Sequence, residues 1–140
     1  MKRIIGLDVG DATIGVAVAD ELGLTAQGIG VVRRSTLGVD LKRLGELLED
    51  YPPERFVVGL PLNMNGTVGP QARKVQAFAQ ALGRHFAVEV DTWDERLSTA
   101  AATRTLLQAD VSRARRRQVV DKVAAVLILQ AYMDSRRPPA

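Results

Sequence analysis

Three places in the chain combine a carboxylate with an otherwise apolar segment, where an unpaired charge is costly to bury. They are Asp8, the adjacent pair Asp94 and Glu95, and Asp121. Three carboxylates from separate segments could hold two divalent ions about 4 Å apart, the arrangement that hydrolyses phosphodiester bonds. Mg²⁺ and Mn²⁺ prefer such oxygen ligands. The chain has no Cys, and we expect its single histidine, His85, to lie at the surface.

Each of these acids also has a structural explanation. Asp8 lies just before a turn and could bond the turn amides. Adjacent residues of an extended chain point to opposite sides, so Asp94 and Glu95 cannot both face one site. We favour Glu95, with Asp94 as the alternative, although both could be surface acids that pair with Arg96. Asp121 could simply favour the dipole at the start of a helix.

Length and composition predict one folded domain. The chain has 140 residues, 46% of them hydrophobic, and a net charge of +3. We expect a single domain over residues 1–135 and a disordered tail over 136–140. Neither a signal peptide nor a membrane helix is recognisable, so we expect a soluble, cytoplasmic protein. The mild basic balance permits a polyanionic partner without requiring one.

The apolar pattern predicts an α/β fold. An apolar hairpin leads the chain, and strands then alternate with helices, which predicts a mixed five-stranded sheet with helices on both faces. The expected strands are 4–9, 14–19, 26–33, 55–60 and 87–93, and the expected helices are 37–51, 71–83, 98 to about 108, and 119–133. Pro52 and Pro53 would end the first helix, Gly83 the second, and Ser98 would cap the third.

Four segments resemble the YqgF family, also called RuvX. They read Ile5-Gly-Leu-Asp-Val-Gly with Ile14-Gly-Val-Ala-Val, Val58-Gly-Leu-Pro-Leu-Asn-Met-Asn-Gly, Asp94-Glu-Arg-Leu-Ser-Thr, and Asp121-Lys-Val-Ala-Ala-Val-Leu-Ile-Leu-Gln. The resemblance covers nearly the whole chain in order. It implies an RNase H-like fold similar to that of the RuvC resolvase.

The resemblance also implies an activity. The family is described as a Holliday junction resolvase and as a nuclease that matures the 5′ end of pre-16S rRNA. The implied catalytic acids fall on Asp8, Glu95 and Asp121, and the implied cofactor is Mg²⁺ or Mn²⁺. We therefore expect a two-metal-ion endonuclease in which Asp8 binds both ions. Pre-16S rRNA is the expected substrate, and the alternative is a four-way DNA junction, which requires a homodimer; otherwise the protein could be a monomer.

Several polar residues are candidate substrate contacts. In the loop from Pro61 to Pro70, Asn63 could touch the substrate, and Arg96 follows the candidate acids. Four arginines precede Asp121 and could hold phosphates: Arg113, Arg115, Arg116 and Arg117. The alternative for these arginines is a solvated loop. Aromatic residues are only 4% of the chain, which argues against base recognition by aromatic platforms.

Two other classes stay open. The Asp-x-Gly hairpin also occurs in actin-like and sugar-kinase ATPases, but these place a nucleotide between two such domains, and this chain supplies one. A non-catalytic RNA-binding protein is the second possibility, and it predicts that Asp8→Asn leaves function intact.

Overall fold

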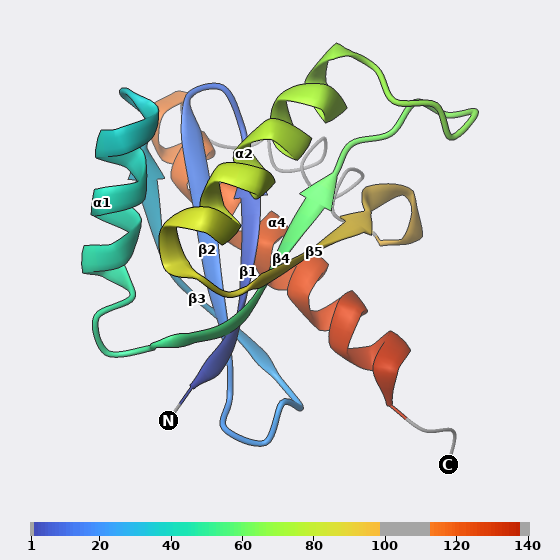
Figure 1. Ribbon diagram of the computed structural model, residues 1–140. Coiled ribbons are helices and arrows are strands. Elements are labelled where there is room, and N and C mark those ends of the chain that lie inside the picture. The colour runs from blue at the N-terminus through green and yellow to red at the C-terminus, as the bar shows by residue number, and fades with distance from the viewer. Residues whose placement is uncertain (1, 99–112, 138–140) are drawn as a thin grey trace.

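The computed structural model describes residues 2–98 and 113–137, and the side chains of 2–98 and 122–137 (Figure 1). The strands of the described part are β1 (Arg3–Val9), β2 (Thr13–Ala19), β3 (Ala26–Arg33), β4 (Pro53–Leu60) and β5 (Glu89–Asp94). The helices there are α1 (Leu37–Leu47), α2 (Pro70–Phe86), the short 3-10 helix η1 (Glu95–Leu97) and α4 (Arg113–Arg136).

The strands form one mixed sheet in the order β3-β2-β1-β4-β5. Strand β2 is antiparallel to β1 and β3, whereas β4 is parallel to β1 and β5. A hydrogen bond of 2.9 Å from the Gly10 N–H to the Thr13 carbonyl closes the turn of the leading hairpin. The predicted mixed five-stranded sheet is therefore confirmed. Because β1, β4 and β5 are parallel, their carboxyl ends lie at the same end of the sheet.

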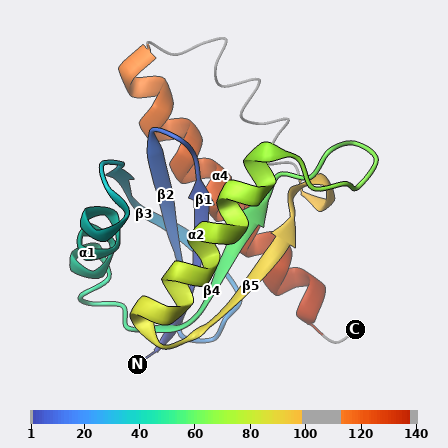
Figure 2. The ribbon, with the colours of Figure 1, turned by 45° about the horizontal axis from the view of Figure 1, so that its top comes forward.

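Helices cover both faces of the sheet, as predicted. Helices α1 and α2 lie on one face and α4 crosses the other (Figures 1 and 2). The larger core lies under α1 and α2 and includes Leu44, Phe56 and Leu82, all fully buried. The second core, under α4, is built largely from small side chains on the sheet and from Ile128 and Leu129 on the helix.

Alternation along β1 separates these two faces. Ile5 and Leu7 belong to the core under α1 and α2. Gly6, between them, faces α4: a Cβ atom there would lie 2.6 Å from Leu129 Cβ and 3.1 Å from the Ala125 carbonyl oxygen. The absence of a side chain at Gly6 thus lets α4 approach the sheet closely. By the same alternation Asp8 lies on the α4 side.

Helix α2 continues beyond its predicted end at Gly83 and stops at Phe86. Gly83 serves packing rather than termination, because a Cβ atom there would lie 3.3 Å from Val90 Cγ2. The helix ends instead at Ala87, whose φ of 56° is left-handed. Strand β5 consequently starts at Glu89.

Helix α1 is shorter than predicted and ends at Leu47 instead of Tyr51. The chain turns before it meets the two prolines, and the Tyr51 N–H donates to the Leu48 carbonyl at 2.9 Å. A residue that precedes proline disfavours the helical conformation, so the helix must stop earlier.

Helix α4 begins at Arg113, six residues before the predicted start at Val119. The alternative of a solvated loop for the basic run is therefore wrong: Ala and Arg favour helices, and the run has no Gly or Pro. The helix ends at Arg136, the first residue of the predicted tail. Apart from Ser98, the predicted helix from 98 to about 108 lies outside the described residues. In the described part of the chain, no helix is long and apolar enough to span a membrane.

Candidate active site

Asp8 is buried near the carboxyl end of β1, with 8% of its surface exposed. Its neighbour on β2 is Gly15. On the other side Leu7 pairs with Val58 of β4, so Gly59 follows in register beside Asp8. Asp8 is thus flanked by glycine on both adjacent strands.

Glu95 enters the same region from β5. It opens η1 directly after β5, and 7% of its surface is exposed. Its Oε1 and Cγ atoms both lie 3.2 Å from the place where a Cβ atom on Gly59 would stand. The Glu95 carboxylate therefore lies over Gly59, one strand away from Asp8.

One small cavity joins the two acids. It has a volume of about 220 Å³ and is lined by Asp8, Val9, Gly10, Gly59, Pro61, Gln71 and Glu95. Its position beyond the carboxyl ends of parallel strands is the usual place for a ligand in such a sheet. Gln71, in the first turn of α2, escaped the sequence analysis because nothing in the local pattern distinguishes it from other helical glutamines.

The structure separates Asp94 from Glu95, as alternation along an extended chain predicts. The Asp94 carboxylate accepts hydrogen bonds from Arg96 Nε at 3.0 Å and from Arg96 Nη2 at 2.7 Å. The side-chain hydrogen bonds from Arg96 hold the pKa of Asp94 below its ordinary value. Asp94 is therefore engaged by Arg96, and Glu95 is the acid that lines the cavity.

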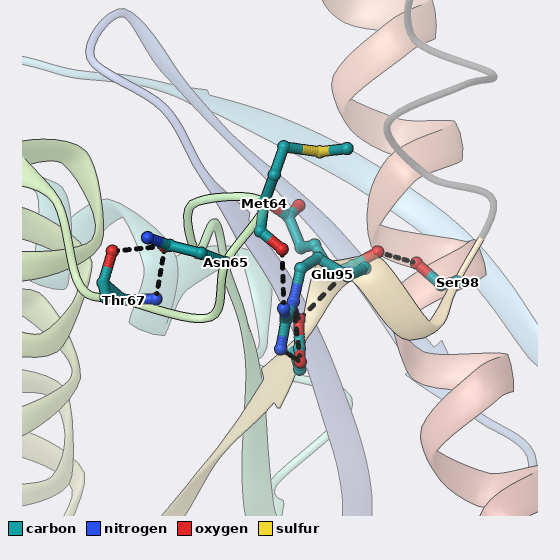
Figure 3. Close-up of polar contacts among 7 residues, drawn as sticks. Met64, Asn65, Thr67, Glu95 and Ser98 are labelled. Atoms are coloured by element: carbon teal, nitrogen blue, oxygen red, sulfur yellow. Dashed lines mark hydrogen bonds and ion pairs between the residues drawn. The ribbon is translucent and has the colours of Figure 1, made fainter.

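Arg96 also holds the loop that follows β4. Its Nη1 atom donates to the Met64 carbonyl at 3.2 Å, as Figure 3 shows. In the same loop the Asn63 side chain donates to Thr67 Oγ1 at 2.8 Å, and its atoms pack against Gly69. Asn63 and Arg96, the predicted substrate contacts, thus have defined structural partners in this conformation.

Asp121 belongs to α4, one helical turn before Ala125, whose carbonyl packs on Gly6 of β1. Its side chain lies outside the described residues. The same holds for the side chains of the four predicted phosphate contacts, Arg113, Arg115, Arg116 and Arg117. Among the described side chains no group of three His, Cys, Asp or Glu residues could hold a metal ion. The described structure therefore brings together Asp8 and Glu95 of the three predicted acids.

A buried ion pair supports the turn beside the cavity from the opposite face. Asp40 of α1 is fully buried and accepts from Arg34 Nε at 3.2 Å and from the Ser35 N–H at 2.7 Å. Arg34 Nη1 donates to the Gly10 carbonyl at 3.0 Å. Since Gly10 lines the cavity, the pair of Arg34 and Asp40 helps to fix the turn that follows Asp8. Sequence reasoning missed this pair because its partners meet only through the tertiary fold.

Three further ionisable groups have structural roles. His85 is exposed, as predicted, and its ring packs edge-on against Phe86 with centroids 4.8 Å apart. Asp11, in the hairpin turn, pairs with Lys74 at 3.5 Å. Asp20 accepts from the Leu24 N–H at 2.7 Å, a bond that lowers the pKa of Asp20.

The donor atoms around the cavity suit a hard divalent cation. Asp8 and Glu95 can offer carboxylate oxygens and Gln71 an amide oxygen, and among the described residues the lining contains no His or Cys. Mg²⁺ and Mn²⁺ bind such all-oxygen sets. The residues present therefore fit the cofactor that the sequence implies.

The mixed sheet, the helices on both faces and the acids at the carboxyl ends of β1 and β5 define an RNase H-like α/β protein. Solved structures support this class. The chain resembles Thermus thermophilus RuvC in complex with a Holliday junction substrate, with a TM-score of 0.57 and 18% identity over 96% of this chain and 95% of that chain. It also resembles the fowlpox virus Holliday junction resolvase, with a TM-score of 0.53 and 16% identity over 95% and 98%.

The chain belongs to the RuvX family, whose model, described as Holliday junction resolvase, matches residues 2–135. A relative from Symbiobacterium thermophilum is 60% identical over 98% of this chain and 96% of its own length. Another, from Heliobacterium modesticaldum, is 58% identical over 96% and 90%. Both relatives are provisionally named pre-16S rRNA nucleases.

Proposed function

We propose that this protein is a metal-dependent endonuclease whose catalytic residues are Asp8, Glu95 and Asp121. The observation that carries the proposal is the shared cavity: two nearly buried carboxylates, from β1 and from the end of β5, line one small space at the carboxyl ends of the strands. Asp121 is assigned from the family motif and from its place in α4, the helix that packs on the Asp8 side of the sheet.

The three carboxylates would together hold a pair of divalent ions, Mg²⁺ or Mn²⁺. When bound, such ions lower the pKa of water and neutralise charge on a phosphate. The protein contributes a fixed arrangement of ligands: Asp8 is held in a central strand, and Glu95 is held over Gly59 by the short helix that follows β5. Because both acids are nearly buried, little rearrangement would be needed before a phosphate could react.

The proposed substrate is pre-16S rRNA, cleaved during maturation of its 5′ end. Support comes from the relatives that share more than half of their residues with this chain and carry that name. Such a substrate implies a cytoplasmic location. The basic start of α4, with Arg113, Arg115, Arg116 and Arg117, would supply phosphate contacts at the end of the helix that carries Asp121. Asn63, in the loop after β4, and Arg96, next to Glu95, would also contact the substrate.

A second candidate is the resolution of four-way DNA junctions. It is favoured by the description of the family model and by the likeness of the fold to RuvC. Symmetric cleavage of a junction needs two active sites, so this function would require a homodimer.

The test is cleavage of two labelled substrates side by side, a 16S precursor leader RNA and a synthetic four-way DNA junction, with Mg²⁺ or Mn²⁺. Wild type is compared with Asp8→Asn and with the matched control Glu49→Gln, an exposed acid at the end of α1. RNA cut by wild type and control but not by Asp8→Asn supports the rRNA nuclease. Paired nicks in the junction, made by wild type and the control but not by Asp8→Asn, support the resolvase. Equal cleavage by Asp8→Asn, or none by any variant, contradicts the proposal.

A further inference from the structure

Met64 stands at the tip of the loop between β4 and α2, and 94% of its surface is exposed. A single exposed apolar side chain is common on protein surfaces and needs no explanation by itself. This one is unusual in its setting, because the loop that displays it is internally bonded and is attached to the segment that carries Glu95.

Hydrogen bonds within the loop fix the backbone on both sides of Met64. The Asn63 N–H donates to the Thr67 carbonyl at 2.9 Å, and the Gly66 N–H donates back to the Asn63 carbonyl at 2.8 Å. The Asn65 side chain accepts from the Thr67 N–H at 3.1 Å. Gly66 has a φ of +86°, a conformation that other residues rarely adopt. The loop therefore presents Met64 from a defined backbone.

Arg96 joins this loop to the candidate catalytic segment. Its guanidinium is held by Asp94 on one side and donates to the Met64 carbonyl on the other. Arg96 directly follows Glu95, so the peptide of Met64 is placed relative to that carboxylate by a single side chain. In Figure 3 the Met64 side chain extends away from the loop. Leu97, on the other side of Arg96 in the chain, is also 66% exposed.

We propose that Met64 is a base-contacting wedge, which packs against an unstacked nucleobase of the substrate beside the candidate active site. Methionine is among the side chains that proteins insert between bases, and its polarisable thioether makes favourable contacts with aromatic rings. Such a contact would supply base recognition to a chain in which only 4% of residues are aromatic. The inference rests on the proposed nuclease function, since it takes a nucleic acid as the ligand.

The test uses a single-stranded RNA oligonucleotide that carries the fluorescent base 2-aminopurine at successive positions, titrated in EDTA so that no cleavage occurs. Wild type and Met64→Leu should raise the fluorescence at one position, because the base leaves its stack. Met64→Gln keeps the length of the side chain but loses its apolar character, and should bind about 3- to 10-fold more weakly without the rise in fluorescence. The matched control is Leu22→Gln, which also replaces an exposed apolar side chain by glutamine. Leu22 is 79% exposed and lies at the opposite end of the sheet.

Titrations of Met64→Gln that match wild type would overturn the proposal. So would a change of oligomeric state in Met64→Gln with unchanged RNA binding, measured by light scattering, because it would assign the side chain to a protein contact. The two inferences fail separately. If wild type binds the probe through Met64 but cleaves neither substrate, only the proposed nuclease function is contradicted. If the protein cleaves its substrate and Met64→Gln cleaves and binds it as well as wild type does, only the proposed role of Met64 is contradicted.

Discussion

Two buried acidic sites lie on opposite faces of the sheet, on either side of the β1–β2 turn. Under α1, Asp40 is fully buried and is paired with Arg34 at 3.2 Å. On the α4 side, Asp8 and Glu95 are nearly as buried, with 8% and 7% of their surfaces exposed, but they line a cavity. The turn connects the two, since Gly10 lines the cavity and its carbonyl accepts from Arg34.

The difference teaches that burial of an acid does not identify a catalytic residue. Asp40 is the more completely buried acid, yet its oxygens are taken by Arg34 and by the Ser35 N–H. Asp8 and Glu95 instead line a space in which a ligand could stand. The functional criterion is therefore access to a space that a ligand could enter. Substitutions at the cavity should mainly affect activity, and substitutions at Asp40 should mainly affect stability.

The largest expected effect is on activity at the cavity. Asp8→Asn should lower the cleavage rate by about 100-fold or more, because it removes a charge on which the proposed chemistry depends. Its thermal unfolding midpoint should stay close to that of wild type, since asparagine keeps the size and shape of the aspartate side chain. Cleavage assays and thermal unfolding of the same preparation measure both. A large loss of stability would instead make Asp8 a structural acid like Asp40.

The opposite pattern is expected at the other site. Asp40→Ala should lower the free energy of unfolding by about 3 kcal/mol, because it removes the counter-charge of Arg34 and leaves Arg34 Nε and the Ser35 N–H without their acceptor. Urea unfolding measures this loss. Cleavage by the fraction that remains folded should stay within about 10-fold of wild type, a smaller loss than that of Asp8→Asn. A loss of activity equal to that of Asp8→Asn would show that the pair of Arg34 and Asp40 is part of the catalytic machinery.

An intermediate effect is expected where the cavity meets α4. A Cβ atom on Gly59 would lie 2.5 Å from Ile128 Cδ1 and 3.2 Å from Glu95 Oε1. Gly59→Ala should therefore cost about 1–3 kcal/mol in unfolding free energy, through overpacking, and should slow cleavage by displacing Glu95. The control is Gly38→Ala in α1, where a Cβ atom has nothing within 4 Å. That variant should be as stable as wild type or slightly more stable.

The smallest effect is expected at the edge of the sheet, far from the cavity. The Tyr132 hydroxyl donates to Asp91 at 2.5 Å, and this bond, together with Arg55, holds the pKa of Asp91 below its ordinary value of 3.8. Tyr132→Phe should lower stability at neutral pH by about 1 kcal/mol. Unfolding experiments at neutral pH measure this loss.

The same contact sets a pH dependence. A carboxyl group whose pKa is lower in the folded protein stabilises the fold above pH 3.8 and loses that contribution as the pH falls through its folded pKa. In wild type, Asp91 should therefore contribute to acid unfolding below about pH 3.8. Because Tyr132 is the largest cause of the shift, Tyr132→Phe should show a shallower loss of stability in that range. Identical slopes for the two proteins would contradict the assignment.

Sequence patterns predicted the strands well because each apolar run is bounded by turn residues. They predicted helix ends less well. Gly83 looked like a terminator, but its role is close packing against Val90, a contact that local sequence does not encode. The predicted last helix started at Val119 and left out the basic run, although the intrinsic propensity of that run favours the helix that α4 forms.

The candidate site, too, was predictable only where it depends on local sequence. Strand alternation predicted that Asp94 and Glu95 cannot face the same point, and in the structure Glu95 lines the cavity while Asp94 is bonded to Arg96. The same search for acids in apolar surroundings overlooked Asp40, the fully buried one, since an amphipathic helix normally shows its acids to solvent. Gln71 and Arg34 reach the cavity region only through long-range packing, and the sequence around each of them does not indicate that position.

Strand β1 at the start of the chain and α4 at its end depend on each other, with Gly6 packed directly against Leu129. During synthesis the first strands leave the ribosome long before α4 exists. Until then the face of the sheet that carries Ala17 and Val57 has no cover from this helix. A growing chain would thus carry Asp8 without α4, and any nuclease activity that needs both must wait until α4 has been synthesised.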